Sequence, residues 1–485
     1  MITNQLSAAD AAAERHALRG RLTTFKVIVM VVAAVAPMST VVGYFPLAFM
    51  LGSGYATPVT YVLAGVVMVM FAVGYGAIAR RISAAGGFYS YIAKGLGRPA
   101  GGSAGLVATV AYNALVALLI AGLGYFGNLV VQQQLNLDVP WWAISGAGVA
   151  LAGVLGYTSV DLAGLVVSVL IAAEIGLIVV LDVAVVASKG LAAFPLAALD
   201  PSHIFTTGSL GIGMMFAFAS FTGFESAAIY AEETVDPKRS IPRATIGAAV
   251  VVSVFYALTS WITVGAIGTG NVAADASEAQ GDLVFGISQE FAGHAMTVLL
   301  SVAVVSSMFA SQLSLHNATS RYMFALGRER MLPSWMGASH PRLRTPSRAS
   351  LVQTAFSAVV LAVFALLGLD PYLSMVTIAT GLGAMGIVLL QAGAAAAIVA
   401  YFWRRREQTG LVTIVVTAVS CCVFVALTVL ILLNFKLLTG ATSDTIYVLP
   451  VLLLLMALGG AAHALWLRRH RPEDYALIGS FTGDE

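Results

Sequence analysis

The stretch FASFTGFESAAIYAEE, residues 218–233, places polar groups inside a long apolar segment. Ser220 and Thr222 carry hydroxyls, Gly223 tolerates unusual backbone conformations, and Glu225 carries a carboxyl group. A charged side chain at the centre of a bilayer costs about 2.5–3.5 kcal/mol on insertion scales, so a carboxylate there is a functional candidate. Hydroxyls, bare backbone and a carboxylate together can bind a small polar solute and exchange a proton.

A second apolar segment is interrupted in a similar way. The run AAVAPMSTVVGYF, residues 33–45, places Pro37, Ser39, Thr40 and Gly43 near the middle of the segment 24–52. Non-helical backbone at mid-bilayer depth is tolerated only where it lines a cavity or is buried in protein. A kinked helix satisfied by its neighbours is the alternative for each break alone. Two breaks at corresponding positions favour a binding site between two halves of a transporter.

The composition excludes a soluble protein. Of the 485 residues, 59% are hydrophobic and 10% are charged, whereas soluble domains are about 25% charged. Apolar segments of about 20 residues, long enough to cross a bilayer, recur along the whole chain. We expect an all-α integral membrane protein with twelve transmembrane helices, near residues 24–52, 57–79, 102–131, 141–158, 162–187, 207–231, 244–267, 294–325, 348–368, 372–402, 410–435 and 446–467.

The distribution of Lys and Arg predicts the orientation. With the N-terminus inside, 23 of the 25 basic residues lie in inner segments, which leaves only Lys189 and Lys436 outside. Both termini are therefore expected in the cytoplasm, and the protein in the cytoplasmic membrane. Residues 1–22 are polar, which indicates a cytoplasmic arm and not a removable signal peptide.

Three stretches on the predicted inner side resemble signatures of one transporter superfamily. They are GFESAAIYAEETVDPKRSIPRA at 223–244, ARRISAAGGFYSYIAKGLGRPAG at 79–101 and NATSRYMFALGRERMLPSWM at 317–336. In type, spacing and order they are similar to motifs of the amino acid–polyamine–organocation (APC) superfamily, and the resemblance covers nearly the whole chain.

The resemblance implies a leucine-transporter-like architecture with discontinuous helices 1 and 6 and alternating access around a midplane site. It divides the chain into an arm (1–22), a ten-helix core (23–402), two appended helices (403–467) and a tail (468–485). Within the core, inverted five-helix repeats are expected at about 23–187 and 207–402.

Substrate-binding candidates follow from the two breaks. The start of a half-helix has unpaired N–H groups and partial positive charge, which favour a substrate carboxylate. Carbonyls at the breaks, including that of Pro37, can accept from a substrate ammonium. Asn113 and Tyr125 are weaker candidates for contacts to the substrate side chain. The predicted substrate-binding residues in the breaks are Met38, Ser39, Thr40, Val41, Val42, Gly43, Phe218, Ala219, Ser220, Phe221, Thr222 and Gly223.

Coupling and gating candidates are Glu225, Glu174, His316 and Phe224. The resemblance places a proton-coupling or gating glutamate at the position of Glu225 in some relatives; a structural acceptor for broken-helix N–H groups is the alternative. Phe224 is a gating face or a packing residue.

Three further assignments stay open. Asp182 is a functional carboxylate or one hydrated near the outer interface. His316 is a hydrogen-bonded interior residue or lines a sodium-like site with Ser311, Ser314 and Asn317. The charged loop after helix 6 is an interface anchor or an inner-gate ion-pair network; the groups concerned are Glu232, Glu233, Asp236, Lys238, Arg239, Arg243, Arg80, Arg81 and Arg321.

The sequence predicts a secondary active transporter that moves amino acids or related amines by alternating access, coupled to protons or by exchange. A polyamine or amine importer or exchanger of the same superfamily is the alternative, and a channel is less favoured. Its expected partners are the small-molecule substrate, a proton or counter-substrate and membrane lipid. The sequence has no protease, hydrolase or nucleotide-binding signature, so no enzymatic activity, cofactor, metal or nucleic acid is expected.

Overall fold

The computed structural model describes residues 23–82, 87–158, 164–225, 234–343, 345–405, 410–441 and 443–479, and it is built from helices. Ten helical stretches in these residues are long and apolar enough to cross a membrane. They are Thr24–Gly52, Gly54–Ala79, Arg98–Leu135, Leu170–Ala193, Lys238–Ile267, His294–Arg328, Ser347–Leu366, Pro371–Arg405, Leu411–Leu433 and Asp444–His470.

Two further predicted spans coincide with weaker helices. The segment 141–158 forms α8 (Trp141–Thr158), and the segment 207–231 contains α10 (Leu210–Ala219), which is only 10 residues long. Because neither is among the ten candidate spans, the number twelve stays a prediction, as do the two inverted repeats. The expected multi-pass helical membrane protein is confirmed.

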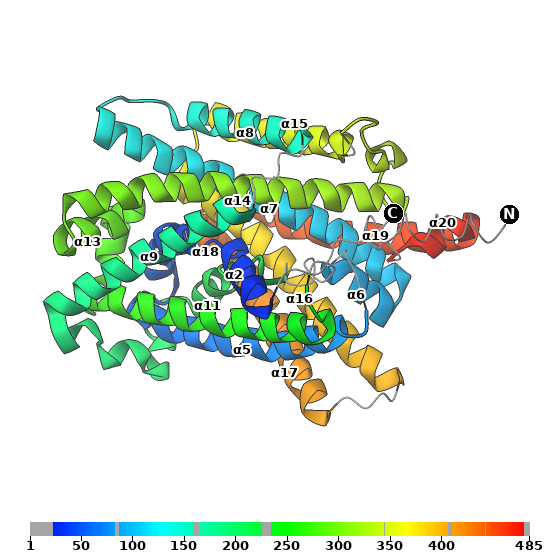
Figure 1. Ribbon diagram of the computed structural model, residues 1–485, viewed down its shortest axis with the longest axis horizontal. Coiled ribbons are helices and arrows are strands. Elements are labelled where there is room, and N and C mark those ends of the chain that lie inside the picture. Colours follow the sequence, from blue (N-terminus) through cyan, green and yellow to red (C-terminus); the bar gives the residue numbers. More distant parts are fainter. Residues whose placement is uncertain are drawn as a thin grey trace.

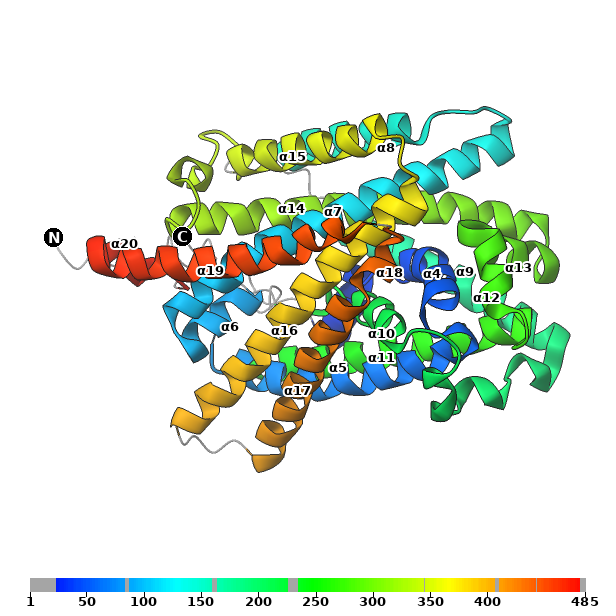
Figure 2. The same ribbon diagram turned by 180° about the vertical axis from the view of Figure 1, so that it is seen from behind.

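Most long helices run along the longest dimension of the molecule (Figure 1). Helices α6 (Gly87–Leu96) and α20 (Pro472–Leu477) lie at one end, and α12 (Val272–Ala279) and α13 (Leu283–Phe291) lie at the opposite end (Figures 1 and 2). The predicted inner loop and tail therefore share one end, and the predicted outer segment 268–292 lies at the other.

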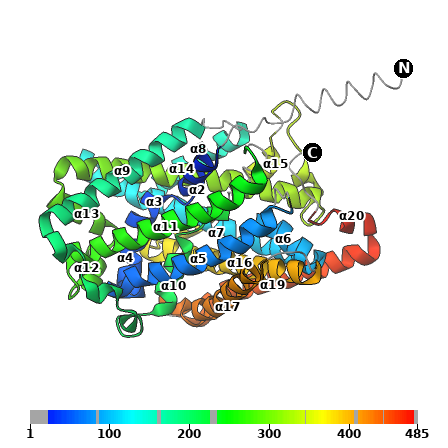
Figure 3. The ribbon, with the colours of Figure 1, turned by 60° about the horizontal axis from the view of Figure 1, so that its bottom comes forward.

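Helices α5 and α11 lie side by side, with α2 against α11, on one side of the molecule, and α16, α17 and α19 lie together on another (Figure 3). The residue ranges of the other long helices are α2 (Thr24–Ala34), α5 (Thr57–Ala79), α7 (Arg98–Leu135), α9 (Gly164–Lys189), α11 (Pro237–Ile267), α14 (His294–Arg328), α15 (Ser347–Leu366), α16 (Thr377–Arg405), α17 (Leu411–Leu433) and α19 (Val448–His470). Short helices include α3 (Pro37–Ser39), α4 (Phe45–Leu47) and α18 (Phe435–Thr439).

The outer surface of the helix bundle is apolar. Large hydrophobic side chains stand exposed along α15 and α17, among them Leu366 at 87%, Val412 at 73% and Leu433 at 70% exposure. A surface of this kind requires lipid contact, because apolar area in water is unfavourable. Inside the bundle, glycines permit close helix contacts: a Cβ on Gly102 of α7 would lie 2.6 Å from the carbonyl oxygen of Gly460 of α19.

Candidate functional site

The first apolar segment is broken between α2 and α3. Helix α2 ends at Ala34, and Ala36 has left-handed backbone angles (φ 52°, ψ 68°). A new helix then starts at Pro37 and has no side-chain cap at its N-terminus. The N–H groups of Met38 and Ser39 lie in this first turn, where intrahelical acceptors are missing. Beyond Ser39 the helix continues through a π-helical turn, Thr40–Tyr44.

The second break follows α10, which ends at Ala219. The chain turns through residues 220–223, and Gly223 has φ 104°. Only glycine adopts this region without strain. The hydroxyl of Thr222 is buried and has no hydrogen-bond partner, although buried polar groups normally have one. The N–H groups of residues 220–224 are all hydrogen-bonded, so the group available to a ligand at this break is the Thr222 hydroxyl.

The two broken segments run in opposite directions. The far end of the first segment meets the start of α10: the Ser209 N–H donates to the Gly52 carbonyl over 2.8 Å. A Cβ on Gly52 would lie 2.9 Å from the Gly213 Cα, so the two backbones touch. From this contact α10 runs back toward the level of the first break.

Tyr256 of α11 connects the two breaks. Its hydroxyl donates to Thr40 Oγ1 over 3.1 Å, and its ring lies edge-on to Phe221 with centroids 6.0 Å apart. At the second break, the hydroxyls of Tyr61 and Ser220 are 3.0 Å apart. Thr40, Ser220 and Phe221 are all buried. The structure thus brings both predicted halves of the substrate site together around one buried tyrosine.

Aromatic residues cover the first break toward the end that holds α12 and α13. The Tyr372 hydroxyl donates to the Gly43 carbonyl over 2.9 Å. The Tyr372 ring stacks on Tyr125 with centroids 4.7 Å apart, and a Cβ on Gly281 of the predicted outer segment would clash with the Tyr125 ring. Tyr125, a weak substrate-contact candidate, therefore belongs to this cover.

Glu225 lies immediately after the second break and is 7% exposed. Its Oε1 accepts from the Tyr112 hydroxyl over 2.7 Å, and its Oε2 accepts from the Gly223 N–H over 3.0 Å. Tyr75 of α5 donates to the Glu225 carbonyl over 3.2 Å. The carboxyl group of Glu225 therefore connects the end of the broken helix to α7, and its backbone carbonyl connects it to α5. This geometry fits both the coupling role and the structural-acceptor role predicted for it.

Glu174 of α9 approaches the first break through Ser307 of α14. The Ser307 hydroxyl contacts the Glu174 carboxyl group and lies 3.3 Å from the Ser39 hydroxyl. Glu174 is 4% exposed, and its Oε2 has no hydrogen-bond partner. A buried carboxyl oxygen without a partner is a candidate for binding a proton or a cation.

The remaining substrate-site candidates in the breaks are mainly packing residues in this conformation. Met38 and Val42 are fully buried, and Val41 is 2% exposed. Phe218 packs edge-on to Phe424 with centroids 5.6 Å apart.

Phe224 lies close to the second break, and Asn113 lies on α7. Phe224 packs against Phe71 and Tyr75, with ring centroids 5.8 and 5.7 Å away. Asn113 donates to the Thr109 carbonyl of its own helix over 2.7 Å, which leaves its Oδ1 without a partner. The Asn113 oxygen is thus available to a substrate donor.

His316 contacts a different part of the bundle. Its Nε2 lies 3.0 Å from the Ser350 hydroxyl of α15, and a Cβ on Gly156 of α8 would lie 2.7 Å from its ring. Ser307 and Met308 of α14 contact the first broken segment, one at Ser39 and the other at Gly43. These contacts match the hydrogen-bonded interior reading of His316.

The structure describes only some of the residues of the predicted inner-gate network. Glu232 and Glu233 lie outside the described residues. Asp236 and Arg239 form an exposed ion pair at 3.7 Å, and pairs of this kind contribute about 0–1 kcal/mol. The network stays a prediction.

Sequence reasoning missed the tyrosines. Tyr61, Tyr112, Tyr256 and Tyr372 carry most of the side-chain hydrogen bonds at the two breaks. A signal was present, because a tyrosine inside an apolar span needs a partner for its hydroxyl when it is buried. The sequence does not show which partner that is.

Helices of this length and an apolar exterior define a multi-pass membrane protein. A family model described as amino acid permease matches residues 26–475. An uncharacterized transporter of Mycobacterium tuberculosis is 30% identical over 353 residues, which cover 71% of this chain and 74% of that protein. The low-affinity putrescine importer of Escherichia coli K12 is 27% identical over 381 residues, or 76% and 79% of the two chains.

Cationic amino acid transporter 7 of Arabidopsis thaliana is 28% identical over 183 residues, which cover 37% of this chain and 30% of that protein. The chain belongs to the amino acid permease family of the APC superfamily. It is therefore a membrane transporter and not an enzyme. The superfamily resemblance of the three sequence stretches is confirmed.

Proposed function

We propose that this protein is a secondary active transporter that moves amino acids or related amines across the cytoplasmic membrane by alternating access. The observation that carries the proposal is the pair of antiparallel broken helices joined by Tyr256. The first break presents the uncapped first turn at Pro37–Ser39, and the second presents the unpartnered hydroxyl of Thr222. Tyr256 contacts both broken segments inside the bundle. Such a place binds a small polar solute and does not form a continuous pore.

The chemistry of the breaks fits a substrate with both charges of an amino acid. The uncapped first turn at Pro37–Ser39 is suited to a carboxylate. Carbonyl groups at the end of α10 and the free Asn113 Oδ1 are suited to an ammonium group. The substrate-binding residues proposed for these contacts are those predicted from the sequence.

A polyamine or another amine is the second candidate substrate class. The buried acidic groups near the breaks, Glu174 and Glu225, favour a cationic solute. The related putrescine importer and cationic amino acid transporter agree with such a substrate. An amine that lacks a carboxylate would have no group to bind the N–H groups of the first turn at Pro37–Ser39.

Proton coupling is proposed for Glu225 and Glu174. Both carboxyl groups are buried, and each lies beside a break and accepts from neutral hydroxyls. Protonation of Glu225 would weaken its acceptor bonds to Tyr112 and Gly223 and release the end of the broken helix from α7. A conformational step and a proton would thus be linked at one residue.

The covers over both ends of the site fit alternating access. Tyr372 and Tyr125 lie over the first break, and Glu225, Tyr112 and Phe224 close the opposite end. We propose that these covers open in turn. In this account, Gly43 and Gly223 allow the backbone to contact the substrate.

The test is a thermal-shift screen of the purified protein against the amino acids and common polyamines, followed by uptake in proteoliposomes. We expect at least one compound to stabilise the protein, and its uptake to saturate and to accelerate when unlabelled compound is loaded inside. Uptake that rises linearly with concentration and shows no counter-transport would identify a channel and contradict the proposal.

A further inference from the structure

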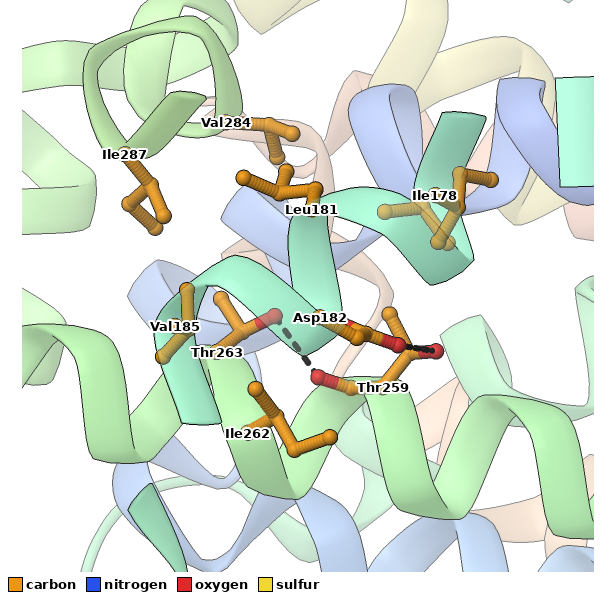
Figure 4. Close-up of a pocket in the computed structure, with 10 residues that line it drawn as sticks. Ile178, Leu181, Asp182, Val185, Thr259, Ile262, Thr263, Val284 and Ile287 are labelled. Carbon is orange, nitrogen blue, oxygen red and sulfur yellow. Dashed lines mark hydrogen bonds between the residues drawn. The ribbon is translucent and has the colours of Figure 1, made fainter. Parts of the chain in front are cut away.

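A small cavity lies in the half of the molecule that holds α12 and α13. It is lined by α9, α11, α13 and Val41 of the first broken segment, and Asp182 of α9 is its one charged residue (Figure 4). The Thr259 hydroxyl of α11 donates to Asp182 Oδ2 over 2.7 Å. Thr263 stands one turn further along α11 and also faces the cavity. The rest of the lining is aliphatic.

Asp182 and Glu174 lie on the same side of α9. They are eight residues apart, with Ile178 between them, and this spacing keeps side chains on one face of a helix. At 1.5 Å per residue the separation along the helix is about 12 Å. Ile178 lines the cavity and is 1% exposed. Helix α9 therefore carries one carboxyl group in the outer cavity and another beside the first break.

We propose that Asp182 is the outer proton acceptor of this transporter, and that it supplies Glu174 along α9. The inference rests on the proton coupling given above as part of the proposed function. A proton leaves the outer water and binds an Asp182 carboxylate oxygen. On hydration of the α9 face, this O–H bond breaks, and the proton passes through water to the unpartnered Oε2 of Glu174. Asp182 returns to a carboxylate.

The size of the cavity decides between a proton and a larger occupant. Its free volume is about 10 Å³, close to the room that a single water molecule needs. A substrate with an ammonium group and a carbon chain does not fit there in this conformation. The aliphatic lining also offers too few oxygen ligands for a metal cation.

No other charged group of the described residues lines this cavity. Among the elements packed against α9, α11 carries Tyr256, which is engaged with Thr40. On α13, α14 and α2 the groups Glu290, His294 and Lys26 are exposed, and His316 of α14 contacts the Ser350 hydroxyl of α15. Lys189 of α9 donates to the Ala266 carbonyl. Asp182 therefore responds to the outer proton concentration without a nearby counter-charge.

Infrared spectroscopy of the purified protein tests the proposal without a substrate. We expect an absorption of a protonated carboxyl group that appears as the pH falls, is missing in Asp182→Asn, and is kept in Asp182→Glu. Asp200→Asn is the matched control, because Asp200 is exposed near the same end of the molecule and its contacts are local to Ser202. An unchanged absorption in Asp182→Asn would overturn the proposal.

Uptake in proteoliposomes separates a proton acceptor from a residue that merely connects α9 to α11. The probes are radiolabelled lysine and putrescine. We expect Asp182→Asn to exchange the transported probe at the wild-type rate. Its uptake rate under a pH gradient that is acidic outside should fall at least tenfold. If Asp182→Asn lowers exchange and gradient-driven uptake equally, or lowers neither, the proton role is contradicted. Wild-type protein that exchanges a probe but ignores the pH gradient would overturn this inference and leave the transporter assignment in place.

Discussion

Buried tyrosine hydroxyls organise the polar groups at the two breaks. Each comes from a different element: Tyr61 from α5, Tyr112 from α7, Tyr256 from α11, and Tyr372 from the π-helical turn before α16. They contact Ser220, Glu225, Thr40 and the Gly43 carbonyl, respectively. A neutral donor satisfies a buried acceptor without adding a charge, so these contacts can be exchanged for contacts with a substrate at small cost.

At the residue scale, Glu225→Gln is expected to flatten the pH dependence of uptake. Glutamine keeps the shape and one acceptor toward Tyr112 or Gly223 but does not exchange a proton. The measurement is initial uptake rate against pH in proteoliposomes. Tyr112→Phe is the matched control, since it removes the contact and keeps the carboxyl group. A wild-type profile in Glu225→Gln would leave Glu225 with a structural role only.

Gly223→Ala should weaken substrate binding more than Gly43→Ala. Gly223 has φ 104°, where any other residue is strained by about 1–3 kcal/mol. This cost corresponds to about a 5- to 150-fold loss of affinity if it falls on the bound conformation. A Cβ on Gly43 meets only the flexible end of Met308 at 3.4 Å. Titration calorimetry with the best compound of the screen measures both, and equal affinities would remove the second break from the site.

Among the helices, both breaks and the position of the second could be predicted, but the residues of the first break could not. The cluster of Pro37, Ser39, Thr40 and Gly43 indicates an interruption, and the helix does break, but at Val35 and Ala36. Pro37 explains the difference, because proline disfavours helical angles in the residue before it and starts a helix well. The second break falls at Ser220–Gly223, inside the predicted stretch. Tertiary contacts such as Ser39 with Ser307 have no sequence signal at all.

Tyr372→Phe is expected to loosen the cover over the first break. The variant removes one hydrogen bond to the Gly43 carbonyl, worth about 0.5–1.5 kcal/mol. The open population should therefore rise about 2- to 10-fold. The measurement is the rate at which a membrane-impermeant thiol reagent labels Val41→Cys, after Cys421 and Cys422 are replaced by alanine. A labelling rate equal to that of the Tyr372 parent would show that this hydrogen bond does not control access.

At the scale of the whole molecule, composition and charge predicted the membrane class and the distribution of loops between the two ends. The basic loop with α6 and the tail with α20 do lie opposite the acidic segment with α12 and α13 (Figure 2). The number of twelve spans stays a prediction, because α8 and the 10-residue α10 are not among the ten candidate spans of the described residues.

The positive-inside count predicts which end faces the cytoplasm. Single cysteines at Asp275 and Asp444 should react with an impermeant thiol reagent in intact cells, and one at Arg471 should react only after the cells are opened. Asp444 and Arg471 are exposed in the structure, and Asp275 is half-buried. The background again lacks Cys421 and Cys422. The reversed labelling pattern would invert the orientation and the direction assigned to both covers.

The proposed mechanism is that backbone groups at the breaks of two antiparallel helices hold the substrate. Its most direct test is an electron cryo-microscopy structure with the strongest compound of the thermal-shift screen bound. We predict density within hydrogen-bond distance of the Met38 and Ser39 N–H groups and of carbonyls at the end of α10. Density elsewhere in the bundle, with both breaks unoccupied or both segments as continuous helices, would contradict it.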